Sequence, residues 1–314
     1  MKNKRLLILP LFGLLLFVSC RNTPKDPRHT DTITSGIISI SADESFSPIV
    51  QQEIDVFENK FPTAEIIPFY VSEVDAINLL LRDSVRMTIA TRTLTAGEKE
   101  HLKNNKFFVK EIKIATDGIA VIVNNSNADS LISVSDLQKI MTGKITSWKE
   151  LNPESPLGDL TLVFDNPNSS TVRYAIDSIC RGEPLSANLN AQNDNPAVID
   201  FVAQVPGAMG IIGAAWIGNK NDSTRLSFRE DIRVMRVSRE KKATLSDSYK
   251  PYQAYLALGD YPLTRNVYIL LTDPRTGLAS GFTTFIVSDI GQRIILKTGI
   301  VPATQSIRVV NVRD

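Results

Sequence analysis

The chain has 314 residues, more than a single hydrophobic core usually holds, so we expect two domains. Its apolar content of 43% and charged content of 22% are typical of a folded globular protein rather than a disordered or fibrous one. The formal net charge is +1, and no segment is dense enough in Lys and Arg to follow a phosphate backbone, which argues against nucleic acid as a partner.

The N-terminus has the pattern of an export signal. Three basic residues precede an apolar run over 6–18, which is too short to span a bilayer comfortably. The run ends at Ser19-Cys20 and resembles the lipobox of bacterial lipoproteins, which implies a lipoprotein signal peptide over 1–19 and lipid attachment at Cys20. A plain secretory signal with an incidental cysteine is the alternative. The polar residues 20–34 then predict a flexible tether.

Three strand-like runs, each followed by a helical pattern, open the folded part of the chain. The strands are expected at 37–41, 65–71 and 87–90. Pro68 indicates that the second strand lies at an edge of the sheet. The helices that follow are expected to start with the caps Ser47, Ser72 and Thr95. This repeated strand–loop–helix pattern predicts a parallel α/β sheet, and ligands of such sheets bind outside the carboxyl ends of the strands.

A long apolar stretch follows, from 107 to 124, and it is long enough to cross from one domain to the other. Ser133 or Ser135 is expected to cap the next helix. Farther on, strands are expected at 209–213 and 261–270, and the last helices are expected to carry the aromatic and aliphatic residues between 282 and 295.

The stretch from 160 to 213 gives the best local indication of function. A strand at 160–164 leads into the polar loop 165–171, which opens a helical pattern. A strand that stops at a hydroxyl-rich loop before a helix is a generic anion cradle, because free backbone N–H groups and hydroxyls face one spot. Ser169, Ser170 and Thr171 are therefore candidate donors to an anion. Ordinary helix caps use the same residue types, which is the alternative role.

Two other loops are expected to reach the same edge of the sheet. Ser45 and Phe46 follow the first strand, and Thr91 and Arg92 follow the third. We expect the hydroxyls to donate hydrogen bonds to a ligand and Arg92 to supply positive charge. The alternatives are that Phe46 only staples the start of a helix and that Arg92 is a solvated surface charge.

Catalysis and metal binding find little support in the sequence. His29 and His101 have no evident Ser or Cys partner, and there is no Cys/His metal spacing and no Walker-type loop. Beyond Cys20 only Cys180 remains, and its apolar neighbours predict a buried thiol. We expect no enzyme activity, no metal and no cofactor.

An ordered set of segments carries a family resemblance. These segments are 117–124, 137–148, 169–171, 206–213, 261–265, 291–292 and 299–302. Together they resemble the phosphate-binding proteins of ATP-driven phosphate transporters, over nearly all of residues 36–305. The resemblance implies an α/β fold of the two-lobed periplasmic-binding-protein type II class, with two crossing strands as the hinge. Lobe I would be residues 35–116 plus 263–314, and lobe II residues 117–262.

The ligand residues depart from the family pattern. Asp165 stands where the family has an Arg, and Thr91 stands where it often has an Asp that accepts a proton from phosphate. The resemblance then implies that Arg92, or else Arg173, supplies the cation. Carboxyl groups in the loops, at Asp43, Glu44 or Asp165, are candidates to accept the proton of a protonated oxyanion.

The resemblance implies a function in transport. The protein would be a monomer outside the cytoplasm, periplasmic or at the cell surface, held to a membrane by its lipid anchor. It would capture inorganic phosphate or a related small oxyanion between its lobes and deliver it to the membrane permease of an ABC importer. The alternative is a lipoprotein of the same fold whose degenerate ligand site serves a structural, sensing or surface-interaction role. A hydrolase is a third reading with less support.

Overall fold

The computed structural model describes residues 31–306 except 188, 220 and 223–226. The expected signal peptide over 1–19, Cys20 and the tether up to residue 30 lie outside the described residues. Within the described part of the chain, no helix is long and apolar enough to cross a membrane.

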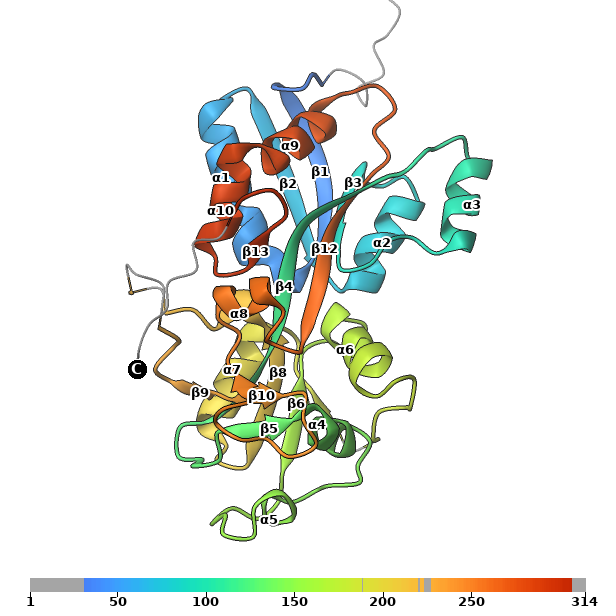
Figure 1. Ribbon diagram of the computed structural model, residues 1–314. Coiled ribbons are helices and arrows are strands. Elements are labelled where there is room, and N and C mark those ends of the chain that lie inside the picture. The colour runs from blue at the N-terminus through green and yellow to red at the C-terminus, as the bar shows by residue number, and fades with distance from the viewer. Residues whose placement is uncertain (1–30, 188, 220, 223–226, 307–314) are drawn as a thin grey trace, which may run out of the picture.

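The described elements alternate between strands and helices along most of the chain (Figure 1). The strands are β1 (Gly36–Asp43), β2 (Ala64–Val71), β3 (Met87–Ala90), β4 (Lys110–Asn124), β5 (Leu131–Ser133), β6 (Thr161–Phe164), β7 (Asn190–Ala191), β8 (Ala208–Gly213), β9 (Ile232–Val234), β10 (Arg236–Ser238), β11 (Ser248–Tyr249), β12 (Thr264–Leu271) and β13 (Val301–Pro302). The α-helices are α1 (Ser47–Lys60), α2 (Glu73–Leu81), α3 (Ala96–Asn104), α4 (Val134–Met141), α5 (Trp148–Leu151), α6 (Ser170–Tyr174), α7 (Asn195–Gln204), α8 (Gln253–Leu258), α9 (Leu278–Val287) and α10 (Asp289–Lys297). The short elements are the 3₁₀ turns η2 (Glu44–Phe46) and η4 (Ala214–Trp216) and the π-helical turn η3 (Ala175–Ile179).

The strands form one long sheet that passes through both halves of the molecule. Its order is β2-β1-β3-β12-β4-β8-β6-β7. The strand–loop–helix units pair in parallel, as the sequence predicts, in β1 with β2 and β3 and in β6 with β7 and β8. The long strands β4 and β12 run antiparallel to each other and to their neighbours, so the sheet is mixed rather than wholly parallel.

The two long strands join two lobes, each with its own core. We call the part with β1, β2 and β3 lobe I and the part with β6 and β8 lobe II (Figure 1). In lobe I, α1, α9 and α10 pack on one face of the sheet, and α2 and α3 pack on the other. Phe57 lies at the centre of the first core, with ring centroids 5.2 Å from Phe282 and 5.3 Å from Phe285.

Lobe II is also layered, and the alternation along β4 shows why residues 119–123 are all apolar. Ile119 and Val121 pack with α4, β6 and η3, whereas Ala120 and Ile122 pack against α7 and η4. Because successive side chains of a strand point to opposite faces, both faces of this segment are buried under helices. The long apolar run at 107–124 is thus confirmed as a strand that spans both lobes.

Most predicted helix starts are confirmed. Ser72, Thr95 and Ser133 each accept a hydrogen bond from the backbone N–H three residues later, as N-caps do. The start of α1 differs, because the short turn η2 precedes it and the capping side chain belongs to Asp43, which accepts the N–H of Ser45. Ser47 is the first helical residue rather than the cap.

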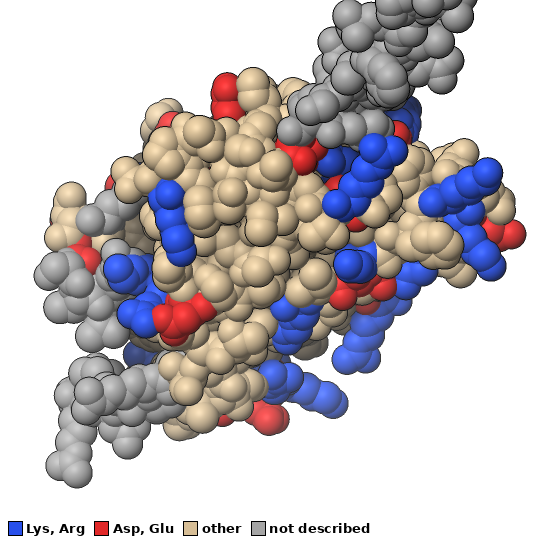
Figure 2. All heavy atoms as spheres, turned by 90° about the horizontal axis from the view of Figure 1, so that it is seen from above, with Lys and Arg blue, Asp and Glu red and all other residues tan. Residues whose placement is uncertain are grey.

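The charges visible on the end of the molecule in Figure 2 are mixed. Basic and acidic side chains lie in small separate groups among uncharged residues on that face, without a continuous basic stripe. This distribution agrees with the near-neutral composition of the chain.

Candidate functional site between the lobes

The carboxyl end of β1 and the loop after β6 meet between the lobes at one buried carboxylate. Asp43 is 1% exposed and ends β1 in lobe I. Its Oδ1 accepts the backbone N–H of Ser45 at 2.8 Å, and its Oδ2 accepts the backbone N–H of Ser170 in lobe II at 3.1 Å. The two loops that the sequence predicts to face a common ligand are therefore in direct contact.

A buried ion pair lies beside this contact, on the two strands that join the lobes. Arg265 of β12 is opposite Asp117 of β4, and its Nε donates to Asp117 Oδ2 at 2.9 Å. Its Nη1 donates to the Ser170 hydroxyl at 2.6 Å, and its guanidinium carbon lies 5.2 Å from the ring centre of Phe46. Burial alone would lower the pKa of Arg265, but the carboxylates of Asp117 and Asp43 outweigh burial and raise it, so the group stays charged.

Several polar atoms at this crossing are buried without any hydrogen-bond partner among the described residues. They are the Ser45 and Thr171 hydroxyls, Arg265 Nη2 and Asp117 Oδ1. A Cβ placed on Gly213 would lie 3.4 Å from Arg265 Nη2 and 3.8 Å from Ser45 Cβ, so the glycine leaves room beside these donors. Buried polar groups are nearly always satisfied, so the two hydroxyls and the guanidinium Nη2 are candidate donors to a small anion.

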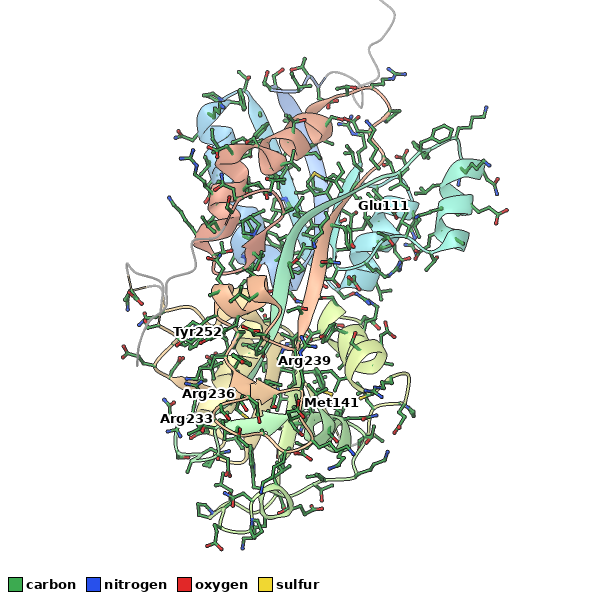
Figure 3. The ribbon with its side chains drawn as sticks, in the orientation of Figure 1. Glu111, Met141, Arg233, Arg236, Arg239 and Tyr252 are labelled. Atoms are coloured by element: carbon green, nitrogen blue, oxygen red, sulfur yellow. The ribbon has the colours of Figure 1, made fainter. Side chains whose placement is uncertain are left out.

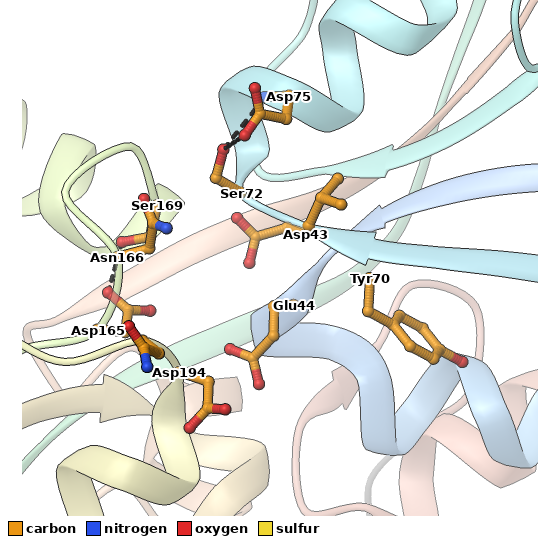
Figure 4. Close-up of a pocket in the computed structure, with 11 residues that line it drawn as sticks. Asp43, Glu44, Tyr70, Ser72, Asp75, Asp165, Asn166, Ser169 and Asp194 are labelled. Carbon is orange, nitrogen blue, oxygen red and sulfur yellow. Dashed lines mark hydrogen bonds between the residues drawn. The ribbon is translucent and has the colours of Figure 1, made fainter.

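On one side of the crossing lies an acidic cavity of about 310 Å³ (Figure 4). Asp43 and Glu44 of lobe I face Asp165 and Asp194 of lobe II across it. Burial raises the pKa of Asp165 to about 7, although the Ser169 hydroxyl donates to this carboxyl group at 2.5 Å. Burial also raises the pKa of Glu44. Carboxyl groups therefore outnumber the buried guanidinium of Arg265 at this site, and Asp165 is partly protonated near neutral pH.

On the other side lies an open cavity of about 380 Å³, lined by Thr91, Arg92, Arg173 and Arg265 among others. Arg92 forms a two-pronged ion pair with Glu98, at 2.7 Å for each nitrogen, within lobe I. Thr91 donates its hydroxyl to Glu73 at 2.7 Å and accepts from Arg173 at 2.6 Å. These side chains are engaged with protein groups rather than with the buried space at the crossing.

The lobes make further direct contacts around the site. The side-chain amide of Asn195 donates to Glu44 at 2.7 Å, and the indole N–H of Trp216 donates to the carbonyl oxygen of Ser45 at 3.0 Å. Each of these hydrogen bonds joins lobe II to lobe I. We call this arrangement, in which the lobes touch, the closed form of the cleft.

Arg233 lies on β9, Arg236 lies on β10, and Arg239 directly follows β10 (Figure 3). Arg233 donates to the carbonyl oxygen of Asn125 at 3.1 Å, and Arg239 donates to that of Gly259 at 2.9 Å. Their hydrogen bonds hold loops of the lobe in place. Arg265 is the guanidinium that meets the buried hydroxyls.

The structure brings together five of the residues proposed from sequence. Ser45, Phe46, Ser169, Ser170 and Thr171 are buried where the lobes meet, and Ser169 also caps α6 by accepting the N–H of Val172. Thr91 and Arg92 lie at the open cavity instead.

Arg265 and Asp117 were not proposed from sequence as ligand residues. The available signal was a charged residue in each of the two crossing segments. Asp117 comes just before the apolar run 119–123, and Arg265 is the one charged residue of β12. A charge that is buried in such a segment needs a partner.

The fold and the cleft define a class: two α/β lobes joined by two crossing strands, with polar loop ends facing each other between them. Residues 27–289 match the model of the PBP superfamily domain, and the chain belongs to that superfamily. It is 26% identical over 315 residues to the phosphate-binding protein PstS of Bacillus subtilis (strain 168), covering 96% of this chain and 95% of that protein. It is 23% identical over 252 residues to the PstS protein of Staphylococcus aureus (strain USA300), covering 78% of this chain and 72% of that protein.

Solved structures share the fold. A putative phosphate ABC transporter substrate-binding protein from Clostridium perfringens, solved with bound phosphate, has a TM-score of 0.71 at 21% identity, covering 86% of this chain and 100% of that one. An ABC-type phosphate transport receptor from Vibrio cholerae has a TM-score of 0.63 at 20% identity, covering 85% and 100%. These similarities confirm the two-lobed periplasmic-binding-protein architecture expected from the sequence.

Proposed function

We propose that this protein captures phosphate, or a closely related small oxyanion, between its lobes and delivers it to the membrane permease of an ABC importer. The observation that carries the proposal is the set of buried donors without partners at the crossing of the lobes. A tetrahedral oxyanion offers acceptors in several directions, so it could satisfy such donors at once. The names of the Bacillus and Staphylococcus relatives support the choice of phosphate.

The proposed ligand donors come from three parts of the molecule. Ser45 Oγ comes from lobe I, Thr171 Oγ1 from lobe II, and Arg265 Nη2 from the crossing strand. The cation is thus assigned to Arg265 in place of Arg92, because Arg92 is paired with Glu98. In this assignment Phe46 packs beneath the guanidinium, and Ser170 holds it through the 2.6 Å hydrogen bond to Nη1.

The acids around the site favour a protonated ligand. A fully ionised dianion would meet repulsion from Asp43 and Asp165 in a poorly hydrated space. A protonated phosphate can instead donate its O–H to the Asp43 carboxylate, which then acts as a hydrogen-bond partner rather than a repelling charge. We therefore expect phosphate and arsenate to bind better than sulfate, which carries no proton near neutral pH.

The other parts of the proposal concern the whole chain. Residues 35–116 with 263–314 would move as one body and residues 117–262 as the other, by bending of β4 and β12. Cys20 would carry the lipid that holds the protein at a membrane outside the cytoplasm, and the protein would act as a monomer. No catalytic role is proposed.

One observation favours a second candidate, in which the fold is kept without solute capture. Asp43 already accepts the N–H groups of Ser45 and Ser170, which a ligand anion would otherwise use. A protein closed around its own carboxylate could serve as a sensing or structural lipoprotein. Binding measurements separate this candidate from transport.

The test is isothermal titration of the purified protein with phosphate, arsenate and sulfate. Saturable binding of phosphate that weakens in Thr171→Val is the expected result. Ser178→Ala is the matched control, because Ser178 is an exposed hydroxyl residue at the outer cavity. Absence of heat and of thermal stabilisation with all three anions would overturn the proposal in favour of the second candidate.

A further inference from the structure

An ion pair joins the two lobes at the open cavity. Arg173 of α6, in lobe II, donates from Nε to Glu73 Oε2 at 2.6 Å, and Glu73 begins α2 in lobe I. Arg173 Nη2 also donates to the Thr91 hydroxyl at 2.6 Å. Thr91 in turn donates both its N–H and its hydroxyl to Glu73 Oε1, at 2.7 Å each. We call Glu73, Thr91 and Arg173 the latch.

The latch is stronger than an ordinary surface ion pair. The Glu73 side chain is 2% exposed, and that of Arg173 is 31% exposed. Burial would raise the pKa of Glu73, but the hydrogen bonds and charge of Arg173, with the two donors of Thr91, outweigh burial and hold it below the usual range. Opening the cleft removes the hydrogen bond and the charge of Arg173 from Glu73, whereas the two donors of Thr91 lie in the same lobe as Glu73 and remain.

Arg173 also has a second partner on its own helix. Its Nη1 lies 3.3 Å from Asp177, which is largely exposed and one helical turn farther along. When the lobes separate, Arg173 loses Glu73 and Thr91 but keeps Asp177 within reach. The arginine is therefore shared between a contact that exists only in the closed form and one that survives opening.

The position of the latch connects it to the proposed ligand site. Thr91 and Arg173 line the open cavity together with Arg265, whose guanidinium reaches the buried crossing. The latch therefore forms part of the wall of the cavity that Arg265 also lines. The opposite mouth is lined by acids, which would repel a departing anion.

We propose that the contact of Arg173 with Glu73 and Thr91 stabilises the closed form and sets the rate at which the bound oxyanion is released. The second part rests on the proposed function, whereas the first part concerns the lobes alone. Closure then depends on a pair of residues that do not touch the ligand. Arg173 and Glu73 are positioning residues in this scheme.

The experiment compares variants in two measurements. Small-angle X-ray scattering without ligand reports how far the lobes are apart. Stopped-flow fluorescence of Trp216, whose indole joins the lobes through Ser45, reports release of phosphate from the preloaded protein. Arg173→Gln and Glu73→Gln should make the free protein more extended and release phosphate about tenfold faster, because typical coupling energies correspond to 5- to 150-fold effects.

Two further variants make the result specific. Arg92→Gln is the control, because it removes an arginine from the same mouth whose ion pair with Glu98 lies within lobe I. It should leave the scattering and the release rate unchanged. Asp177→Asn removes the competing partner of Arg173, so it should slow release and make the free protein more compact.

The outcomes separate the two proposals. If Arg173→Gln and Glu73→Gln scatter like the wild type while remaining folded by circular dichroism, the latch is refuted, whether or not phosphate binds. An equal effect of Arg92→Gln would refute it as well. If the wild type binds no phosphate but the latch variants are more extended, the role of the latch in closure is supported and the proposed transport function is refuted.

Discussion

Arg265 and Asp117 face each other on the two strands that join the lobes, with Nε and Oδ2 2.9 Å apart and both side chains almost fully buried. Neither residue lies in a loop of the cleft, because both belong to the strands that join the lobes. Its free atoms, Arg265 Nη2 and Asp117 Oδ1, are nevertheless unsatisfied at the point where the loops meet. The crossing strands therefore act both as a connection and as a part of the proposed site.

Removing a proposed ligand donor should weaken phosphate binding without harming the fold. Thr171→Val keeps the shape of the side chain and deletes a hydroxyl that has no partner in the closed form. Hydrogen bonds to charged groups contribute about 1.5–3 kcal/mol, so we expect binding to weaken about 10- to 100-fold. Titration calorimetry measures the affinity, and a melting temperature in free protein at or above that of wild type confirms that folding is intact.

The Arg265–Asp117 ion pair should stabilise the fold as a unit, so losing one partner should cost more stability than losing both. Arg265→Met leaves Asp117 without its cation in a dry environment, which should lower the free energy of unfolding by about 3–5 kcal/mol. Adding Asp117→Asn removes the orphaned charge and should recover a large part of that loss. Urea denaturation of the two single variants and the double variant measures the coupling. Additive losses would show that the pair is not coupled.

Phosphate affinity should acquire a pH dependence from Asp165. Its pKa is raised to about 7 by burial, so the group is neutral below this pH and becomes a carboxylate above it. The added negative charge lies near Asp43 and Glu44 and should weaken anion binding as pH rises from 6 to 8. Asp165→Asn removes this contribution, and phosphate's own titration is common to both proteins. The affinity ratio of variant to wild type should therefore increase on the order of tenfold, which corresponds to about 1.4 kcal/mol. A ratio that stays constant would contradict the assignment.

Glu53 should make the protein less stable as pH rises. It lies in the apolar face of α1 and is 1% exposed, and neither carboxyl oxygen has a hydrogen-bond partner among the residues that the structure describes. Burial raises its pKa from 4.5 to about 9. The folded state therefore holds a proton that the unfolded state releases above pH 4.5, so stability declines between pH 4.5 and 9, by up to about 1.4 kcal/mol per pH unit.

Glu53→Gln should remove this decline, so its advantage in melting temperature over the wild type should grow from pH 5 to pH 8. Glu65→Gln, at an exposed position of β2, is the control and should show no such trend. Equal pH profiles for Glu53→Gln and the wild type would show that Glu53 finds a partner or water in solution.

The local elements were predictable because each carries its own signal. Caps such as Ser72 and Thr95 and the alternation in the first strand are short-range features that fix starts and ends within a few residues. The direction of β12 in the sheet has no such local signal. Whether it runs parallel or antiparallel to β3 and β4 depends on where the chain returns after 140 residues in lobe II, and its own residues do not encode that.

The site was predictable in part for the same reason. Ser45 and Thr171 follow strands, and loops after parallel strands share one edge of a sheet, so their meeting follows from topology. The partner of a long charged side chain is decided by three-dimensional packing. From the sequence, Arg92 and Arg173 were both candidates to bind the ligand. In the structure Arg92 pairs with Glu98, six residues away, and Arg173 pairs with Glu73 across the cleft.

The place of Arg265 on a crossing strand has a kinetic consequence. Residues at the pivot of a hinge hardly move when the two bodies rotate, whereas Ser45 and Thr171 ride on opposite bodies. An incoming anion would thus find the guanidinium already in place in the open molecule and gain the two hydroxyls only afterwards. Contact with the guanidinium would therefore precede enclosure by the two hydroxyls.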